Sequence, residues 1–157
     1  RAVFDERAAA FPDVPVEHAY VDAMALNLVM KPWDYDVLVT ENMFGDILSD
    51  LIAALAGGMG MAPSADIGDD YALFQPAHGT APDIAGQGIA NPTATILSAA
   101  MMLDWLADRH GDSALGDGAR AIENALTTSF AKGVVRPREF GGKSGTADIV
   151  RAVVEGL

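Results

Sequence analysis

The chain has 157 residues, half of them hydrophobic, and contains no cysteine. This length suits one compact domain or parts of two, and the high hydrophobic content excludes intrinsic disorder. The absence of thiols excludes disulfide scaffolds, zinc-thiolate sites and cysteine nucleophiles. Ten Lys and Arg residues against 22 Asp and Glu give a net charge of −12, which argues against a general nucleic-acid binder or a surface for anionic lipid.

The first half of the chain shows alternating signals for helices and strands. In chain order these are a helix end over residues 1–11, a strand over 14–21, a short helix over 22–30, a turn over 31–34, a buried parallel strand over 36–40, and a helix capped by Glu41 and Asn42 whose apolar side carries Phe44, Ile47, Leu48, Leu51 and Leu55. Three glycines over residues 57–60 end that helix and mark a hinge or domain boundary.

The second half continues the alternation. We expect strands over residues 64–67 and 72–75, a glycine- and proline-rich loop over 76–92, helices over 93–108 and 117–132, a glycine-rich loop over 141–145 and a last helix to about residue 155. Alternating strands and helices predict an α/β fold with a mostly parallel sheet. No apolar run reaches the roughly 18 residues of a membrane span and no signal peptide is evident, so we expect a cytoplasmic protein that contacts no membrane.

Asp46 and Asp50 carry the strongest chemical signal. Four residues apart on a predicted helix, they share one face, and this like-charge pairing destabilises an isolated helix. Two hard carboxylate ligands suit Mg²⁺ or Mn²⁺, and Asp22, at the end of a predicted strand, is a possible third ligand. The alternatives are a solvated helix surface for the pair and a helix cap for Asp22.

The second signal is the long loop over residues 78–92. Its glycines allow a close approach of the backbone to a ligand, its prolines stiffen it, and His78, Asp83 and Asn91 offer polar groups. Such a loop could enclose a nucleoside, with Asp83 accepting hydrogen bonds from the ribose hydroxyls. A carboxylate there would repel a 2′-phosphate and so favour NAD over NADP. The alternative is an unusually long generic connection.

Two phosphate-binding motifs are approached but not completed. Gly142, Lys143 and Ser144 resemble the end of a P-loop, but Pro137 falls where the first glycine would stand. Gly86 and Gly88 resemble part of a dinucleotide fingerprint, but they follow a loop rather than a strand. No Lys or Arg lies between Lys31 and Arg109, so an anion bound by that stretch needs a metal ion, backbone N–H groups or cations from elsewhere.

Taken together, four blocks resemble the β-decarboxylating dehydrogenases, which include the isopropylmalate, isocitrate, homoisocitrate and tartrate/malate enzymes. The blocks are residues 20–22, 36–50, 78–92 and 96–103, and the resemblance is strongest to 3-isopropylmalate dehydrogenases. It implies the two-domain α/β fold of that family, with residues 1–56 in the dimerisation, substrate and metal domain and residues 57–157 in the NAD-binding domain.

The resemblance also implies site residues. Asp46 and Asp50 match the divalent-metal ligands, and Asp22 matches a ligand supplied to the neighbouring subunit of a homodimer. The NAD-binding positions that it implies are His78, Gly79, Asp83, Ile84 and Asn91. The implied reaction is oxidation of a 2-hydroxy-dicarboxylate by hydride transfer to NAD, followed by loss of the carboxylate at C3.

The substrate expected first is 3-isopropylmalate, an intermediate of leucine biosynthesis, with tartrate or D-malate and isocitrate or homoisocitrate as alternatives. Family members are roughly twice as long as this chain, which resembles their C-terminal part. The substrate-binding arginines and the catalytic tyrosine and lysine are therefore expected to precede Arg1, and these 157 residues alone are expected to be inactive. A non-catalytic fragment that binds nucleotide weakly, or only associates with another chain, is the remaining alternative.

Overall fold

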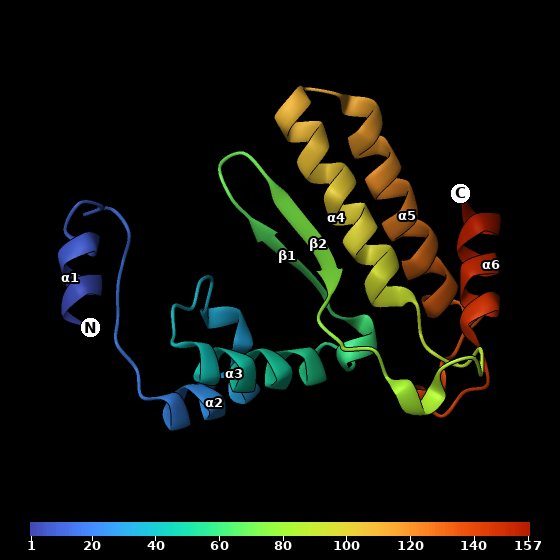
Figure 1. Cartoon of the computed structure of the whole chain (residues 1–157), viewed down its shortest axis with the longest axis horizontal. Helices are drawn as coiled ribbons and strands as arrows, with labels where there is room; N and C mark the ends of the chain where they lie inside the picture. Colours follow the sequence, from blue (N-terminus) through green and yellow to red (C-terminus); the bar gives the residue numbers. More distant parts are fainter. The chain divides into compact units, whose positions relative to one another are not determined.

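A computed structural model describes residues 1–157, and their contacts divide them into two compact units, Arg1–Leu48 and Ser49–Leu157 (Figure 1). The helices are α1 (Ala2–Ala8), α2 (Val21–Met30), α3 (Asn42–Leu55), α4 (Thr93–His110), α5 (Ser113–Ala131) and α6 (Thr146–Gly156), and the strands are β1 (Pro63–Ile67) and β2 (Ala72–Pro76). The division falls within α3, and none of the helices is long and apolar enough to cross a lipid bilayer.

In the first unit, α1 is tied to the extended segment that follows it. The His18 ring nitrogen Nε2 lies 2.6 Å from an Asp5 carboxylate oxygen, and the Arg1 guanidinium lies over the Tyr20 ring. The α2 helix buries Met24 and Leu28, which are one turn apart and so lie on the same face. Both predicted helices are confirmed, although α1 ends at Ala8, three residues before the predicted end.

The two strands predicted in this unit are wrong for this chain. Residues 14–20 and 36–40 are not hydrogen-bonded as strands, and side chains that were expected to be buried are open, with Val37 82% and Val39 73% exposed. The reason is that a strand is completed only by the ladder of a partner strand, and no segment of this chain pairs with either. Both segments therefore present apolar side chains and unpaired backbone groups.

The predicted helix after residue 41 is confirmed as α3, but its apolar side is only partly covered. Leu48 is 5% exposed, whereas Ile47 is 56% and Leu55 46% exposed. Gly57 and Gly58 end the helix with φ angles of 113° and 107°, which L-residues with a Cβ rarely adopt. The Gly58 N–H donates to the Ala53 carbonyl at 2.8 Å, in a glycine-dependent helix end.

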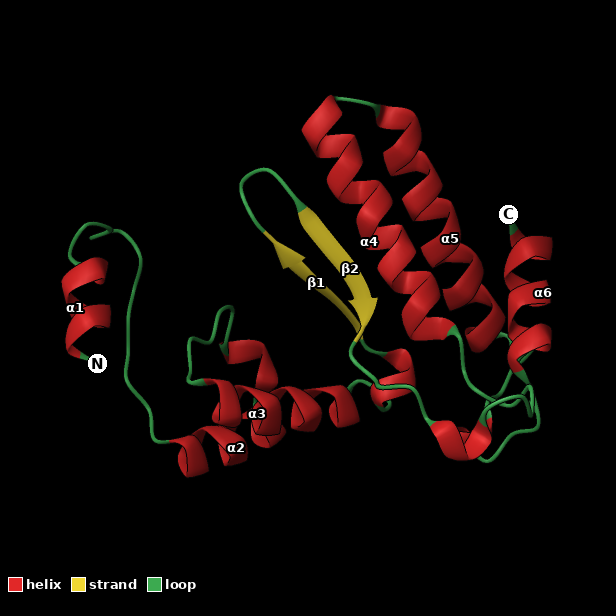
Figure 2. Ribbon diagram, in the orientation of Figure 1, coloured by secondary structure: helices red, strands yellow, loops and turns green.

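The second unit is a row of layers, with the β1–β2 hairpin against α4, α4 against α5, and α5 against α6 (Figure 2). Its core lies where α5, α6 and the segment between them meet. The buried core residues are Ala125, Leu126, Val135, Ile149 and Val153, with Ile96 and Leu97 of α4 packed against them.

The expected parallel sheet is not formed, because the only sheet is the antiparallel hairpin with Pro63 opposite Pro76 and Ile67 opposite Ala72. Both strands were predicted within one residue of their bounds. They pair antiparallel because residues 68–71 form too short a connection for a parallel pair, which needs a crossover of about a dozen residues or more. At the hairpin tip the Arg109 guanidinium of α4 donates to the Asp69 carbonyl at 2.9 Å.

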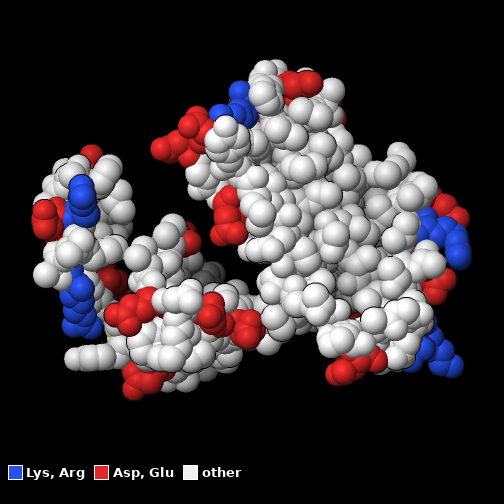
Figure 3. All heavy atoms as spheres, viewed as in Figure 1, with Lys and Arg blue, Asp and Glu red and all other residues white.

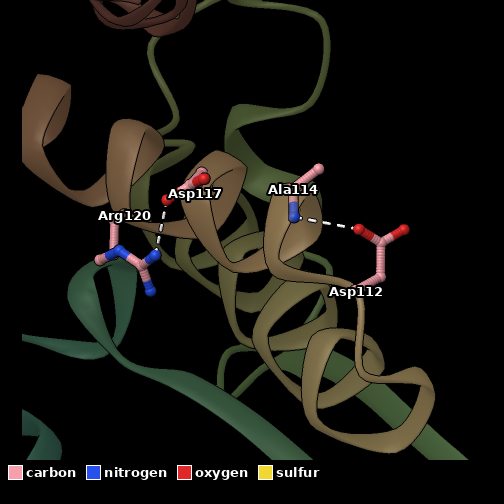
Figure 4. A network of polar contacts seen from close by, with 4 residues as sticks. All are labelled: Asp112, Ala114, Asp117 and Arg120. Atoms are coloured by element: carbon pink, nitrogen blue, oxygen red, sulfur yellow. Dashed lines mark hydrogen bonds and ion pairs between the residues drawn. The ribbon is translucent and has the colours of Figure 1, made fainter.

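The α4 and α5 helices meet at a tight corner that sets their bounds. Gly111, with φ 65°, ends α4, and the Asp112 carboxylate accepts a hydrogen bond from the Ala114 N–H at 3.0 Å (Figure 4). This N-cap starts α5 at Ser113, four residues before the predicted start. In the first turns of α5, Asp117 and Arg120 form an ion pair at 2.6 Å.

Candidate functional site

Asp46 and Asp50 lie one turn apart on α3, and both are exposed. By helix geometry their carboxylates project from one face, about 5 to 6 Å apart at the Cβ atoms. Oxygens at this spacing suit Mg²⁺ or Mn²⁺, which prefer carboxylate and water ligands. The chemistry and accessibility of this pair fit a hard divalent cation, with further ligands coming from other groups.

Asp22 occupies the first turn of α2, as its place at a helix start predicts. One carboxylate oxygen accepts a hydrogen bond from the Ala23 N–H at 2.8 Å, and the residue is exposed. No group of three or more His, Asp or Glu side chains gathers at one point in this chain. The shared role of Asp22, Asp46 and Asp50 as metal ligands stays a prediction.

The cations that border the acidic stretch are already engaged. The Lys31 ammonium lies 3.2 Å from an Asp34 carboxylate oxygen, and this hydrogen bond and charge raise the pKa of Lys31 above its usual value. Arg109 contacts Asp70 at 3.9 Å and lies over the Trp105 ring. Acidic side chains outnumber basic ones on the face seen in Figure 3. An anionic substrate at α3 therefore needs positive charge from a bound cation or from another segment.

The first half of the long loop presents its polar groups to solvent. The His78 ring nitrogen Nδ1 lies 2.8 Å from the Gly79 carbonyl oxygen, which can only accept, so Nδ1 carries a proton in this contact. Ala81 has a φ of 43° and precedes a turn over Pro82–Ile84. Within that turn Asp83 is exposed, and its carboxylate makes no hydrogen bond or ion pair in the structure.

The second half of the loop is held by the segment that precedes α6 and by Thr146, the first residue of that helix. The Asn91 amide nitrogen donates to a Glu139 carboxylate oxygen at 2.7 Å, while the amide oxygen accepts from the Thr93 N–H at 3.1 Å. The Thr146 N–H donates to the Gly88 carbonyl at 2.9 Å, and the Thr146 hydroxyl donates to the Ala90 carbonyl at 2.5 Å. Three positions of the loop, 88, 90 and 91, are therefore bound to residues about 50 positions later in the chain.

The Asn91 side chain has a different environment from the other predicted NAD-binding positions. Gly79 and Asp83 are exposed and Ile84 is half-buried, but Asn91 is only 9% exposed. Both ends of its amide bind protein groups, so the side chain joins the loop to α4 and to Glu139. The amide nitrogen also donates to the Met61 sulfur at 3.3 Å, so both of its N–H groups are bound within the protein.

Glu139 and Thr146 were missed at the level of sequence. The one available signal was the nearby glycines, because glycine often marks a close approach of two backbones. A Cβ at Gly145 would lie 2.5 Å from the Gly88 carbonyl oxygen, and a Cβ at Gly142 would overlap the Arg136 carbonyl oxygen. We had rejected a P-loop at residues 142–144. In the structure the Ser144 hydroxyl accepts a hydrogen bond from the Arg136 N–H at 2.9 Å, which is consistent with that rejection.

Comparison with known proteins defines the class of protein to which this fold belongs. Residues 1–153 match the model of the family described as isocitrate/isopropylmalate dehydrogenase. An isocitrate/homoisocitrate dehydrogenase of Thermus thermophilus is 51% identical over 97% of this chain and 43% of its own length. A 3-isopropylmalate dehydrogenase of Aquifex aeolicus is 46% identical over 100% of this chain and 42% of its own length.

Solved structures agree with this match. The crystal structure of isocitrate dehydrogenase from Methylococcus capsulatus superposes with a TM-score of 0.87 at 43% identity, over 99% of this chain and 44% of that one. The chain belongs to the isocitrate/isopropylmalate dehydrogenase family, and it spans less than half the length of these relatives. The predicted resemblance and fold class are thereby confirmed.

Proposed function

We propose that this chain contributes coenzyme- and metal-binding residues to an NAD-dependent β-decarboxylating dehydrogenase. The observation that carries the proposal is the exposed pair Asp46 and Asp50 on one face of α3, in a chain whose loop at residues 78–91 presents the unpaired carboxylate of Asp83. Membership of a dehydrogenase family supports the reaction class. The relatives are more than twice as long, so we assign the activity to a protein of their length that includes these residues.

In this proposal Asp46 and Asp50 hold Mg²⁺ or Mn²⁺, and Asp22 faces the equivalent site of a second copy in a homodimer. A bound cation would supply positive charge beside the hydroxyl and carboxylate oxygens of the acid. Membership of the isocitrate/isopropylmalate dehydrogenase family supports this assignment of Asp22 and a homodimer with active sites shared between subunits.

Asp83 accepts hydrogen bonds from the ribose hydroxyls of NAD, and His78, Gly79, Ile84 and Asn91 of the same loop line the coenzyme site. NAD would serve as the hydride acceptor in oxidation of the hydroxy acid. The exposed carboxylate of Asp83 supports NAD over NADP, because the 2′-phosphate of NADP would meet a like charge without a compensating cation.

The substrate is proposed to be a 2-hydroxy-dicarboxylate, with 3-isopropylmalate first. Several relatives at 44% to 48% identity are named for isopropylmalate, which supports this choice. The 51% identical relative is named for isocitrate and homoisocitrate, and this observation makes those acids the second candidate. Turnover of purified full-length protein with each acid separates the two, because the ratio of kcat/KM values measures their discrimination.

The central test is Asp46→Asn in the full-length protein that carries this chain. The amide keeps the shape of the carboxylate but removes a charged ligand, so we expect loss of metal-dependent turnover and weaker Mn²⁺ binding. Asp108→Asn is the matched control, because Asp108 is an exposed aspartate on another helix. Unchanged turnover and Mn²⁺ affinity in Asp46→Asn would remove the metal assignment. Absence of turnover from the full-length protein with every acid would favour a non-catalytic role.

A further inference from the structure

The segment that leads into α6, together with Thr146 at the start of that helix, is hydrogen-bonded to the second half of the long loop within the second unit. Figure 1 shows the loop between β2 and α4 running beside the loop that leads into α6. Three hydrogen bonds join the two loops. Thr146 donates to the carbonyl oxygens of Gly88 and Ala90, and the Asn91 amide donates to the Glu139 carboxylate. No polar side chain of this segment was assigned a role by sequence.

These bonds fix one end of the proposed coenzyme loop, and the hairpin fixes the other. The Ala77 N–H donates to the Ala62 carbonyl at 3.0 Å, at the base of the hairpin. Between these two anchors, residues 78–87 make only local bonds, such as that from the Gln87 amide to the Asp83 carbonyl at 2.8 Å. The position of Asp83 therefore depends on the anchors at both ends of the loop.

The chemistry of the Asn91 bond makes Glu139 a specific partner. The Thr93 N–H can only donate, so the amide oxygen of Asn91 faces it and the amide nitrogen must face Glu139. Asn91 is 9% exposed, and a buried amide N–H without an acceptor is costly. The amide nitrogen carries two N–H groups, and the second partner is the Met61 sulfur at 3.3 Å, which is a weak acceptor. The N–H that faces position 139 therefore needs a side chain with an acceptor oxygen there.

We propose that Glu139 and Thr146 are positioning residues for coenzyme binding, which act by holding the 78–91 loop in its binding conformation. The inference rests on the proposed function, in which this loop binds NAD. Loss of either anchor widens the range of loop conformations in the free protein, and binding must then order the loop at a cost in affinity. Neither residue is assigned a contact with the coenzyme or the substrate.

The test uses Glu139→Ala and Thr146→Val in the full-length protein, with Glu139→Gln and Thr146→Ser as conservative partners. Glutamine retains an acceptor oxygen for Asn91, and serine retains the hydroxyl for the Ala90 carbonyl. NADH binding is measured by fluorescence titration, and KM for NAD, KM for the hydroxy acid and kcat by steady-state kinetics. Glu123→Gln is the matched control, because Glu123 is an exposed glutamate on α5.

We expect Glu139→Ala and Thr146→Val to raise the NADH dissociation constant and KM for NAD by about three- to tenfold each, as for loss of one hydrogen bond. KM for the hydroxy acid should stay unchanged, and the conservative variants and the control should lie within about twofold of the parent.

A different pattern overturns the proposal. Unchanged NADH binding in the alanine and valine variants would refute the positioning role while leaving NAD as the coenzyme. A parallel change in both KM values and kcat, without rescue by glutamine or serine, would show a general structural role instead. Failure of the unmodified full-length protein to bind NADH would refute the proposed coenzyme, and with it this inference.

Discussion

Replacing Asn91 by aspartate changes one atom of the side chain and reverses its relation to Glu139. The amide nitrogen that lies 2.7 Å from the Glu139 carboxylate becomes an oxygen of the same size. The other oxygen can still accept from the Thr93 N–H, so that bond is retained. Asn91→Asp therefore removes the amide donor that Glu139 accepts, together with the weaker bond from the same nitrogen to the Met61 sulfur at 3.3 Å.

The cost has two parts. Loss of a hydrogen bond to a charged acceptor removes about 1.5 to 3 kcal/mol. Two carboxylates at this distance would repel by several kcal/mol at an effective dielectric constant of about 20, but Glu139 is exposed and can rotate toward water. We therefore expect a total destabilisation of about 3 kcal/mol, or a decrease in Tm of about 6 to 12 °C for a chain of this size.

The assay is thermal unfolding of the 157-residue chain followed by circular dichroism. The loss should be largest near neutral pH and shrink on acidification, because protonation of one carboxylate removes the repulsion and restores a donor. Asn91→Asp combined with Glu139→Gln should recover stability, since the new amide at position 139 can donate to the introduced carboxylate. A Tm for Asn91→Asp equal to that of the parent near neutral pH would refute this account of the contact.

Three further predictions concern single positions. Asp112→Ala removes the N-cap bond to Ala114 and should cost about 1 kcal/mol in thermal or urea unfolding, whereas Asp112→Asn should be nearly neutral; equal stability of all three would contradict the cap. Gly118→Ala should stabilise α5 by about 0.5 to 1 kcal/mol, because the new Cβ would meet Leu103 at an ordinary 3.8 Å; a lower Tm would be the contrary result. Asp83→Lys in the full-length protein should raise KM for NAD and lower KM for NADP, and unaltered kinetics with both coenzymes would argue against a ribose contact.

Local signals in the sequence predicted the helices well because each signal acts within a few residues. Two glycines at residues 57 and 58 end α3 through their positive φ angles, and the four-residue spacing of Asp46 and Asp50 determines that they share a helix face. The start of α5 was misplaced by four residues because the cap at Asp112 went unrecognised. The exposed loop around Asp83 was also predicted, from its glycines and prolines.

Long-range pairing could not be determined in the same way. The alternation of valines at residues 37 and 39 is compatible with a strand, but a strand forms only where a partner supplies hydrogen bonds, and these side chains stay exposed in this chain. The bond between Asn91 and Glu139 joins residues 48 positions apart, and nothing local to either residue indicates it. The sequence by itself determined the helices, the acidic pair and the family resemblance, because each of these depends on residues that are close together in the chain or on the order of short motifs. Only the tertiary structure decided which segments hold the proposed coenzyme loop, because that depends on contacts made after the chain has folded.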